Sequence, residues 1–450
     1  MIKYLRLRNF RAYRDQSFNF SRLNIFIGAN NSGKSSIISA INLLAQTHAE
    51  SRGSTSPLIL NGPYEELGTF QDIVHGNNVR TPIGFDFGIG DFHVSFDVKY
   101  RLQRRELEIA KFTLLEGDNE IVSYQTKKDK VDVKIKRESI ESVMGNKNVR
   151  RPRFTGFWPF IPEVSFLAIR NSDLPKSSQK IIEQASRSLR MAEMRIRDSF
   201  RFFDTLSPFR AQPQRTYVYS GETPNEIGRT GANGVSLLVN DTSKRGAIKI
   251  GLEEEISEWL KANKIASAIK VKNLTSRHFE ICLVDFKGKE HNVCDVGFGC
   301  SQVLPVLVGG LNLFHKNRAA RSSPTFVVQE PEIHLHPNAQ ASLGSFFVGL
   351  ARYGGQQFIE THSDNLVLRV ARHVALGDID SKDIKLFFVE DSSGEKIVTE
   401  LAINPDGVFD PNWPGGFFPQ RQFESLQLAK ARTHTARSRS DHQLRFTYPE

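Results

Sequence analysis

Apolar and polar positions alternate along the first part of the chain. The runs IKYLRLRNF, SFNF and LNIFIG near the N-terminus carry apolar side chains at alternate positions or in short blocks, as β-strands do. Directly after Gly33, apolar residues recur at helical spacing in KSSIISAINLLAQTHA. The pattern predicts a strand, a glycine-containing turn and a helix in that order.

In the middle of the chain, the spacing of apolar residues changes twice. Between about residues 82 and 137, the alternating runs PIGFDFGIG, FHVSFDVKY, ELEIAKFTLLEG and KVDVKIKRE predict an antiparallel meander. Before them, residues 51–80 are rich in Gly, Ser, Pro and Asn and predict a loop region. Residues 176–205 have helical spacing, but the run is too short and irregular for a long coiled coil.

Helix and strand patterns alternate in the second half. LEEEISEWLKA predicts a helix, and strands follow near residues 267–285. TFVVQE and QQFIETHS have the character of two buried strands, and the helix-length segment between them is typical of a βαβ unit. Residues 426–450 are polar and basic and are expected to be disordered.

The composition indicates the class of protein and the cellular compartment. The chain has 450 residues, 39% of them hydrophobic and 24% charged, which fits a globular protein without a membrane span. Cys282, Cys294 and Cys300 form neither a paired framework nor a zinc spacing, so a reduced, cytoplasmic protein is expected. The net charge of +10 favours an anionic partner and leaves DNA binding open.

A phosphate-binding loop is the first chemical motif. GANNSGKS, residues 28–35, fits the pattern G-x-x-x-x-G-K-[ST] between a predicted strand and a predicted helix. Its amide groups and the helix N-terminus donate to phosphate oxygens, Lys34 reaches the β- and γ-phosphates, and Ser35 ligates Mg²⁺. The motif predicts ATP and Mg²⁺ as cofactors, held by Gly28, Asn30, Asn31, Ser32, Gly33, Lys34, Ser35 and Ser36.

An acidic strand end is the second motif. In many nucleotide hydrolases the strand beside the phosphate loop ends in two carboxylates, one for the Mg²⁺ shell and one that polarises the attacking water. Glu330 takes the position of the water-polarising base, whereas Gln329 takes the metal-shell position without bringing a charge, so slow hydrolysis is expected. Glu332 is a further carboxylate nearby, and His334 and His336 form either an i, i+2 metal pair or, as we favour, a structural pair.

Two further motifs concern the γ-phosphate. His362 follows the next apolar strand, where an imidazole can hydrogen-bond the γ-phosphate and act as a sensor. Gly297, Gly299 and Ser301 stand before an apolar helix and predict a second anion-binding nest. A single chain has no evident need for two such sites, so we expect two copies placed head to tail, each nest completing the site of the other copy.

The order of these motifs resembles a known superfamily. LRLRNFRAY, NIFIGANNSGKSS, GFGCSQVLP, QEPEIHLHP and ETHSDNLVLRV together resemble the ABC-type ATPases of the SMC, RecF and OLD (overcoming lysogenization defect) kind. WPGGFFPQ, residues 413–420, resembles the C-terminal part of bacterial stand-alone AAA-like ATPases of this group. The resemblance covers most of the chain and is weakest across residues 90–200.

The resemblance implies a fold and a domain layout. The fold is expected to be an α/β two-lobed ABC ATPase head over residues 1–425, with a mixed sheet, flanking helices, an antiparallel β lobe and a partly helical insertion. Lobe I would comprise residues 1–90 and 300–400, and the insertion with the helical lobe would comprise about 91–298.

It also implies a mechanism and partners. ATP would lie between two heads, with Ser35 and Gln71 on Mg²⁺ or water, Glu330 as base and His362 as sensor. Relatives of this type often act in anti-phage defence beside a separate nuclease or toxin. The Asp-x-Asp that a Toprim nuclease needs does not follow LFFVEDSSGEKIVTELAINPDGVFD, so no nuclease is expected in this chain.

Three functional hypotheses remain from the sequence. The first is an ATP-gated sensor or scaffold that controls a partner effector, and the second is a RecF-like repair ATPase that binds DNA. The third is a binding module with a structural nucleotide site, against which Lys34, Glu330 and His362 argue. Arg210 and Arg215 are candidates for nucleotide or DNA contact, with structural or solvated roles as the favoured alternative.

Overall fold

The structure is a computed structural model that describes residues 1–51, 56–127, 130–136, 138–139, 153–159, 175–246, 249–318, 323–411 and 413. The tail at 426–450 and all of the WPGGFFPQ motif except Trp413 lie outside the described residues. Trp413 packs edge-on against Phe388 and Phe409, with ring centroids 5.5 and 5.3 Å apart.

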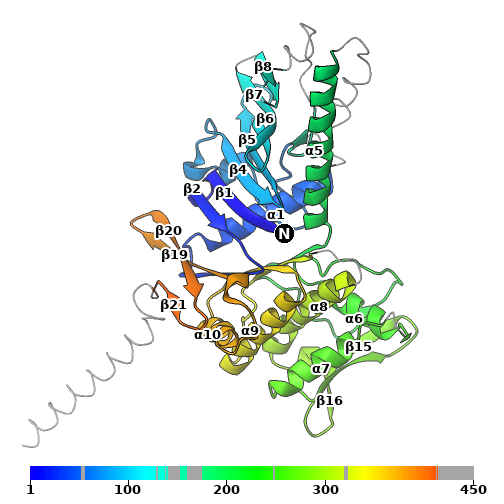
Figure 1. Ribbon diagram of the computed structural model, residues 1–450. Helices are drawn as coiled ribbons and strands as arrows, with labels where there is room; N and C mark the ends of the chain where they lie inside the picture. Colours follow the sequence, from blue (N-terminus) through cyan, green and yellow to red (C-terminus); the bar gives the residue numbers. More distant parts are fainter. Residues whose placement is uncertain are drawn as a thin grey trace, which may run out of the picture.

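An antiparallel sheet forms the upper lobe in Figure 1. Its strand order is β2-β1-β4-β5-β6-β7-β8-β9. The strands are β1 (Ile2–Phe10), β2 (Tyr13–Asn19), β4 (Ile83–Ile89), β5 (Phe92–Arg101), β6 (Glu106–Glu116), β7 (Asn119–Lys127), β8 (Lys130–Ile135) and β9 (Glu138–Ser139). The sheet confirms the predicted meander, and buried and less buried residues alternate along β5 because only one face packs on the core.

A mixed sheet forms the centre of the molecule. Its strand order is β12-β17-β18-β3-β19-β20-β21, parallel from β12 to β19 and antiparallel from β19 to β21. The strands are β12 (Phe203–Leu206), β17 (Thr325–Gln329), β18 (Gln356–Thr361), β3 (Leu23–Gly28), β19 (Ile384–Ser392), β20 (Glu395–Ile403) and β21 (Phe409–Asp410). The pairing of β17 with β18 confirms the predicted βαβ unit.

Both faces of the mixed sheet are covered, which explains why its parallel strands are almost continuously apolar. Phe26, Phe358 and Phe387 join the core that the antiparallel sheet forms with α1 (Lys34–Glu50) and α5 (Lys176–Phe200). The opposite face of the mixed sheet packs in a second core with the following helices: α6 (Gly234–Thr242), α7 (Leu252–Ala262), α8 (Phe298–Arg318), α9 (Pro337–Arg352) and α10 (Asp364–Ala375).

Smaller elements complete the two lobes. The helices of the second core form the lower lobe in Figure 1, together with a sheet of β13 (Tyr217–Val218), β14 (Ala268–Asn273), β15 (His278–Val284) and β16 (Glu290–Asn292). The other short elements are α2 (Phe70–Ile73), η2 (His75–Asn77), β10 (Phe154–Thr155), β11 (Trp158–Pro159), η4 (Val293–Asp295) and η5 (Ser381–Asp383). Among the described helices, none is both long and apolar enough to cross a membrane.

This is the predicted α/β architecture: a mixed sheet with flanking helices, an antiparallel lobe and a partly helical segment that follows the antiparallel strands in the chain. The structure differs from the expected layout at the boundary between residues 90 and 91. That boundary falls in the turn between β4 and β5, which are hydrogen-bonded neighbours, so one sheet runs across it. The segment assigned to the insertion also supplies β12, an edge strand of the mixed sheet.

Candidate functional site

The phosphate loop lies between β3 and α1, as the sequence predicts. Gly28 has a φ of 153°, and a Cβ there would stand 1.9 Å from the carbonyl oxygen of Val389. Gly33 precedes α1 with a φ of 111°, and Asn31 has a φ of 61°. These conformations curl the loop over the N-terminus of a 17-residue helix, where unpaired amide groups favour an anion.

Lys34 lies inside this curl. Its Nζ donates to the carbonyl oxygens of Gly28 (3.0 Å) and Ala29 (2.7 Å), and the residue is 3% exposed. Burial lowers the pKa of the Lys34 ammonium, and the carboxylates of Glu360, Glu330 and Glu332 oppose that shift. A phosphate group would act in the same direction as the carboxylates and favour the charged lysine.

The loop contains a buried polar atom that fits a phosphate oxygen. Ser32 is 1% exposed, and its Oγ has no hydrogen-bond partner within the structure. Buried hydroxyls are rarely left unpaired, so such an atom in an anion cradle indicates a missing acceptor. Together with Lys34 and the α1 N-terminus, it makes the loop a fitting site for the phosphates of ATP.

The other groups that line this cleft come from three strand ends. The cleft has a volume of about 370 Å³, and its wall includes Glu330 after β17, Glu360 and His362 at the end of β18, and Lys396 of β20. The predicted loop residues Asn30, Asn31, Ser32, Gly33, Lys34, Ser35 and Ser36 also line it, together with Arg11 and Ala12 of the antiparallel lobe. Sequence-distant residues therefore meet at the carboxyl edge of the parallel strands, as ligand sites in α/β sheets do.

Glu330 and His362 face each other across part of this cleft. His362 Nε2 lies 3.8 Å from Glu330 Oε1, beyond hydrogen-bonding distance. Glu330 has a φ of 47°, uncommon for a residue other than glycine. Burial and the Lys34 charge lower the pKa of His362, while Glu330 and Glu360 oppose the shift. A neutral imidazole at neutral pH can donate one hydrogen bond to a phosphoryl oxygen.

The strand order corrects one expectation about the acidic motif. The strand directly beside β3 is β18, and β17 lies one strand further out. Gln329 and Glu360 stand opposite each other in the register of β17 and β18. The chain passes from β17 through α9 to β18, which is inserted between β17 and β3, and the sequence order of the motifs does not reveal this.

Glu360 is a residue of the site that the sequence analysis missed. Its Oε1 accepts from the Ser35 hydroxyl at 2.8 Å, and its Oε2 accepts from Gln329 Nε2 at 2.9 Å. It is 3% exposed at the end of a strand that is buried throughout. The signal in the sequence was a single carboxylate in the buried run QQFIET, immediately before the threonine and histidine of the sensor motif.

Glu332 holds the backbone of His362 in place through a hydrogen bond. Its Oε1 accepts from the backbone amide of His362 at 2.5 Å, and its buried Oε2 has no hydrogen-bond partner among the described residues. Burial raises the pKa of this carboxyl, and the hydrogen bond from His362 opposes the shift. Ser363 then caps α10 by accepting from Leu366 N at 3.2 Å, which fixes the backbone on the other side of His362.

The glycine nest lies in a different hollow. Gly297 and Gly299 line a hollow of about 670 Å³ with Lys264, His334 and His336, and no residue of the phosphate loop lines it. A Cβ on Gly299 would stand 2.6 Å from the carbonyl oxygen of His334, so glycine permits close contact between α8 and the turn after β17. Ser301 is the fourth residue of α8 and is buried.

The two histidines of the EIHLHP turn have structural surroundings. His336 is the N-cap of α9, where its Nδ1 accepts from Asn338 N at 3.4 Å, and His334 has a φ of 60°. Within the described part of the chain, no three His, Cys, Asp or Glu side chains gather as a metal cluster.

Three other predicted residues do not line the phosphate-loop cleft. Gln71 is exposed on α2 and is not among the residues that line the phosphate-loop cleft, so the structure does not bring it to Ser35. Arg210 donates to the carbonyl oxygens of Gln329 and Pro208, each at 2.9 Å, and burial lowers its pKa to about 10. Arg215 is exposed and forms an ion pair with Asp295 at 2.6 Å.

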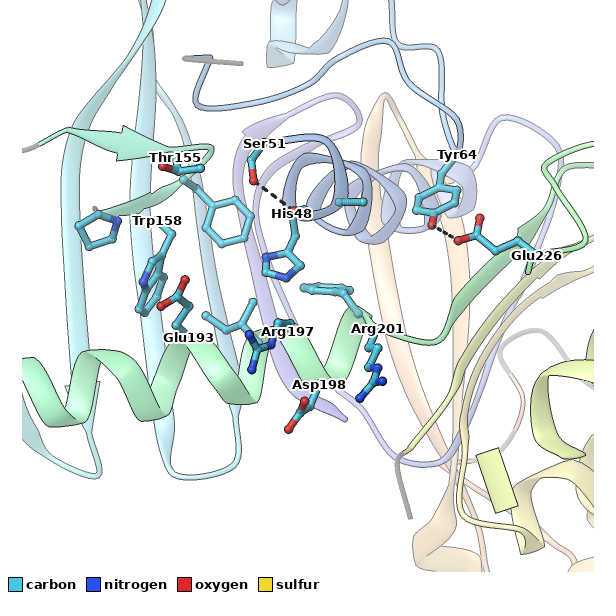
Figure 2. Close-up of a pocket in the computed structure, with 15 residues that line it drawn as sticks. His48, Ser51, Tyr64, Thr155, Trp158, Glu193, Arg197, Asp198, Arg201 and Glu226 are labelled. Carbon is cyan, nitrogen blue, oxygen red and sulfur yellow. Dashed lines mark hydrogen bonds between the residues drawn. The ribbon is translucent and has the colours of Figure 1, made fainter. Parts of the chain in front are cut away.

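A further cavity has a different character (Figure 2). It has a volume of about 830 Å³ and lies between the end of α1, the β10–β11 hairpin and α5. Figure 2 shows Trp158, Glu193 and Arg197 around it, with Tyr64 hydrogen-bonded to Glu226 at one side. It has no glycine-rich loop and mixes both signs of charge, so the nucleotide chemistry belongs to the smaller cleft despite the larger volume here.

Similarity to solved structures is broad but low. The SMC head bound to the C-winged helix domain of ScpA is 11% identical over 90% of this chain and 98% of that one, with a TM-score of 0.39. The SMC head domain from Thermotoga maritima is 12% identical over 88% of this chain and 98% of that one, with a TM-score of 0.34.

Sequence families give the stronger result. No curated protein matches the chain. A family model described as "AAA ATPase domain" matches residues 1–367, and one described as "Protein of unknown function (DUF3696)" matches residues 379–428. The first match spans more than half of the chain and includes Lys34, Glu330 and His362. The chain belongs to the AAA ATPase domain family and is an ATP-binding ATPase.

Proposed function

We propose that this chain is an ATP-dependent switch in which two copies close head to tail around ATP and Mg²⁺. The observation that carries the proposal is the separation of the phosphate loop from the glycine nest. Lys34, Glu330 and His362 line one cleft, whereas Gly297 and Gly299 line another hollow that shares no residue with it. One copy therefore presents a phosphate cradle and, on separate residues, a glycine nest for a second copy.

Each residue then has a defined task in the closed dimer. Lys34 and the amide groups of residues 28–35 hold the phosphates, and bound Mg²⁺ would neutralise charge on the phosphoryl oxygens. Glu330 accepts a proton from the attacking water, and His362 donates from a neutral imidazole to the γ-phosphate. Gly299 of one copy brings the α8 N-terminus towards the γ-phosphate held by the other.

The closed state would control a separate effector. Binding of ATP shifts the population only through its greater affinity for the closed dimer, so binding matters more than rapid turnover. The resemblance to stand-alone ATPases of defence systems favours a nuclease or toxin as the effector and anti-phage defence as the context. A neighbouring reading frame that encodes such a protein, and co-purification of its product only in ATP, would support this part.

The test is the assembly state of two variants in saturating ATP, measured by sedimentation velocity. Glu330→Gln keeps the shape of the side chain but cannot accept the proton, so it is expected to accumulate as a dimer. Lys34→Ala is expected to remain monomeric and to bind ATP at least about 100-fold more weakly, since a charge-assisted phosphate contact is lost.

One result contradicts the head-to-tail dimer: a folded Glu330→Gln variant that binds ATP and stays monomeric. The competing DNA-repair function predicts something else, namely ATP-dependent duplex binding without a partner. The logarithm of the association constant for DNA should then fall linearly with the logarithm of the salt concentration. Because the net charge is +10, duplex binding should be measured at two salt concentrations.

A further inference from the structure

Glu360 connects the phosphate loop to the strand end that lacks an acidic residue. One of its carboxylate oxygens accepts from Ser35 Oγ at 2.8 Å and the other from Gln329 Nε2 at 2.9 Å. The three residues come from α1, β18 and β17, and the register sets Glu360 directly opposite Gln329. Glu360 therefore occupies the space between the Mg²⁺-binding hydroxyl and the position where a carboxylate was expected.

Among the described residues, Glu360 has no direct cationic partner. The residue is 3% exposed, and the two side chains that hydrogen-bond it are a neutral hydroxyl and a neutral amide. Lys34 lies close enough to interact through its charge, but its Nζ donates to two loop carbonyl groups. A buried carboxylate is costly unless a cation or full hydrogen bonding compensates it. A cation bound beside Ser35 would provide that compensation.

Gln329 is already committed to a different task. An amide that faces a carboxylate must present its NH₂ group, so Gln329 donates to Glu360, and only its uncharged Oε1 remains as an acceptor. Gln329 is itself 8% exposed and fixed within β17. It is therefore placed to orient Glu360, in the way that groups around a metal site orient its ligands.

We propose that Glu360 supplies the negative charge of the Mg²⁺ site that Gln329 lacks, and that Gln329 is its positioning residue. The carboxylate of the Mg²⁺ site would then lie at the end of β18 instead of the end of β17. This inference rests on the proposed function, because it assumes that the phosphate loop binds ATP with Mg²⁺.

The experiment measures how nucleotide affinity depends on Mg²⁺. A fluorescent, non-hydrolysable ATP analogue is titrated into the full chain over a range of Mg²⁺ concentrations and in EDTA. Glu360→Gln should raise the Mg²⁺ concentration for half-maximal binding by at least about 10-fold, the usual scale for losing a partner of a metal site. Affinity in EDTA should change little, because Lys34 and the loop amides remain.

Two variants sharpen the assignment. Glu360→Gln combined with Gln329→Glu exchanges the two side chains and should restore much of the Mg²⁺ dependence. Asp204→Asn is the matched control: Asp204 is a buried carboxylate of the same sheet that accepts from Ile227 N at 2.7 Å, outside the cleft. It should leave the Mg²⁺ dependence unchanged whatever it does to stability.

The outcomes separate the two proposals. If the unaltered chain does not bind the analogue, the proposed function fails. If it binds with Mg²⁺ dependence and folded Glu360→Gln keeps that dependence, or loses affinity equally with and without Mg²⁺, only the role of Glu360 fails. If Glu360→Gln does not fold, Glu360→Asp decides: a shift to higher Mg²⁺ supports the assignment, and no shift overturns it.

Discussion

At the scale of single residues, Glu330 combines a proposed chemical role with a strained backbone. Its φ of 47° lies in the left-handed region, which costs a non-glycine residue on the order of 1–3 kcal/mol. Its amide donates to the carbonyl oxygen of Glu360 at 2.7 Å, so pairing with the neighbouring strand holds this conformation. The strained backbone re-aims the side chain into the cleft, which a regular extension of β17 would not do.

The pH dependence of stability should report Glu332. Its folded pKa is raised by burial, so its ionisation favours the unfolded chain once the pH exceeds the usual value near 4.5. Glu332→Gln keeps an acceptor for the His362 amide without that cost. It should therefore gain stability over the unaltered chain as pH rises, by about 1–3 kcal/mol for a buried unsatisfied oxygen.

Denaturant unfolding at pH 4 and pH 8 measures this difference. The two proteins should be most alike at the lower pH and should diverge at the higher one. A constant difference between them would mean that Glu332 does not change its protonation state with folding.

At the scale of elements, the site depends on where strands end. The carboxyl ends of β3, β17 and β18 meet at one edge because the three strands are parallel neighbours. Each end contributes one part: the phosphate loop after β3, Glu330 after β17 and His362 after β18. The turn after β17 then continues to α9 and passes so close to α8 that only glycine fits at position 299.

This close contact between elements can be tested without altering the phosphate loop. Gly299→Ala would force its Cβ to within 2.6 Å of the His334 carbonyl oxygen, so the α8 start and the turn must move apart. We expect ATP binding by a single copy to persist, ATP-dependent dimers to disappear, and stability to fall by about 1–3 kcal/mol. Equilibrium binding, sedimentation velocity and thermal melts give the three readouts.

Gly349 provides the matched control. A Cβ at Gly349 on α9 meets nothing within 4 Å, so Gly349→Ala should keep ATP-dependent dimers. It should also gain up to about 1 kcal/mol from helix propensity. Equal loss of dimers in both variants would point to a general effect of glycine replacement and against the nest.

At the scale of the whole molecule, the antiparallel lobe and the mixed sheet together line the phosphate-loop cleft. Arg11 and Ala12 of the antiparallel lobe and Lys396 of β20 stand in one wall with the phosphate loop. The mixed sheet contributes one face to each hydrophobic core, so packing in both cores positions the strands whose ends line the cleft. Closure of two such molecules around ATP would therefore stabilise the whole fold.

Thermal stability should accordingly depend on protein concentration, but only with ATP. A ligand at 100 times its dissociation constant adds about 2.7 kcal/mol to the folded state, and dimerisation adds a concentration-dependent part. For Glu330→Gln in saturating ATP, Tm should rise with protein concentration. Without nucleotide, or with Lys34→Ala, Tm should stay constant. A concentration-independent Tm for Glu330→Gln in ATP would argue against the dimer.

Much of the fold and part of the site could be predicted from local patterns. The strand–loop–helix around Lys34 and the meander near residues 82–137 follow from periodicity, because a side chain's face depends on its own neighbours in sequence. The Gln329 substitution was visible too, but what compensates for it was not.

Only the tertiary structure decided which strand lies next to which. The sequence by itself determined the phosphate loop, the base Glu330 and the histidine His362 as separate candidates. Strand order placed β18 between β3 and β17, and this brought Glu360 against Ser35, a residue 325 positions away. It also left Gln71 outside the cleft. The physical reason is that parallel strands pair through non-local hydrogen bonds, and no local pattern of side chains records their order.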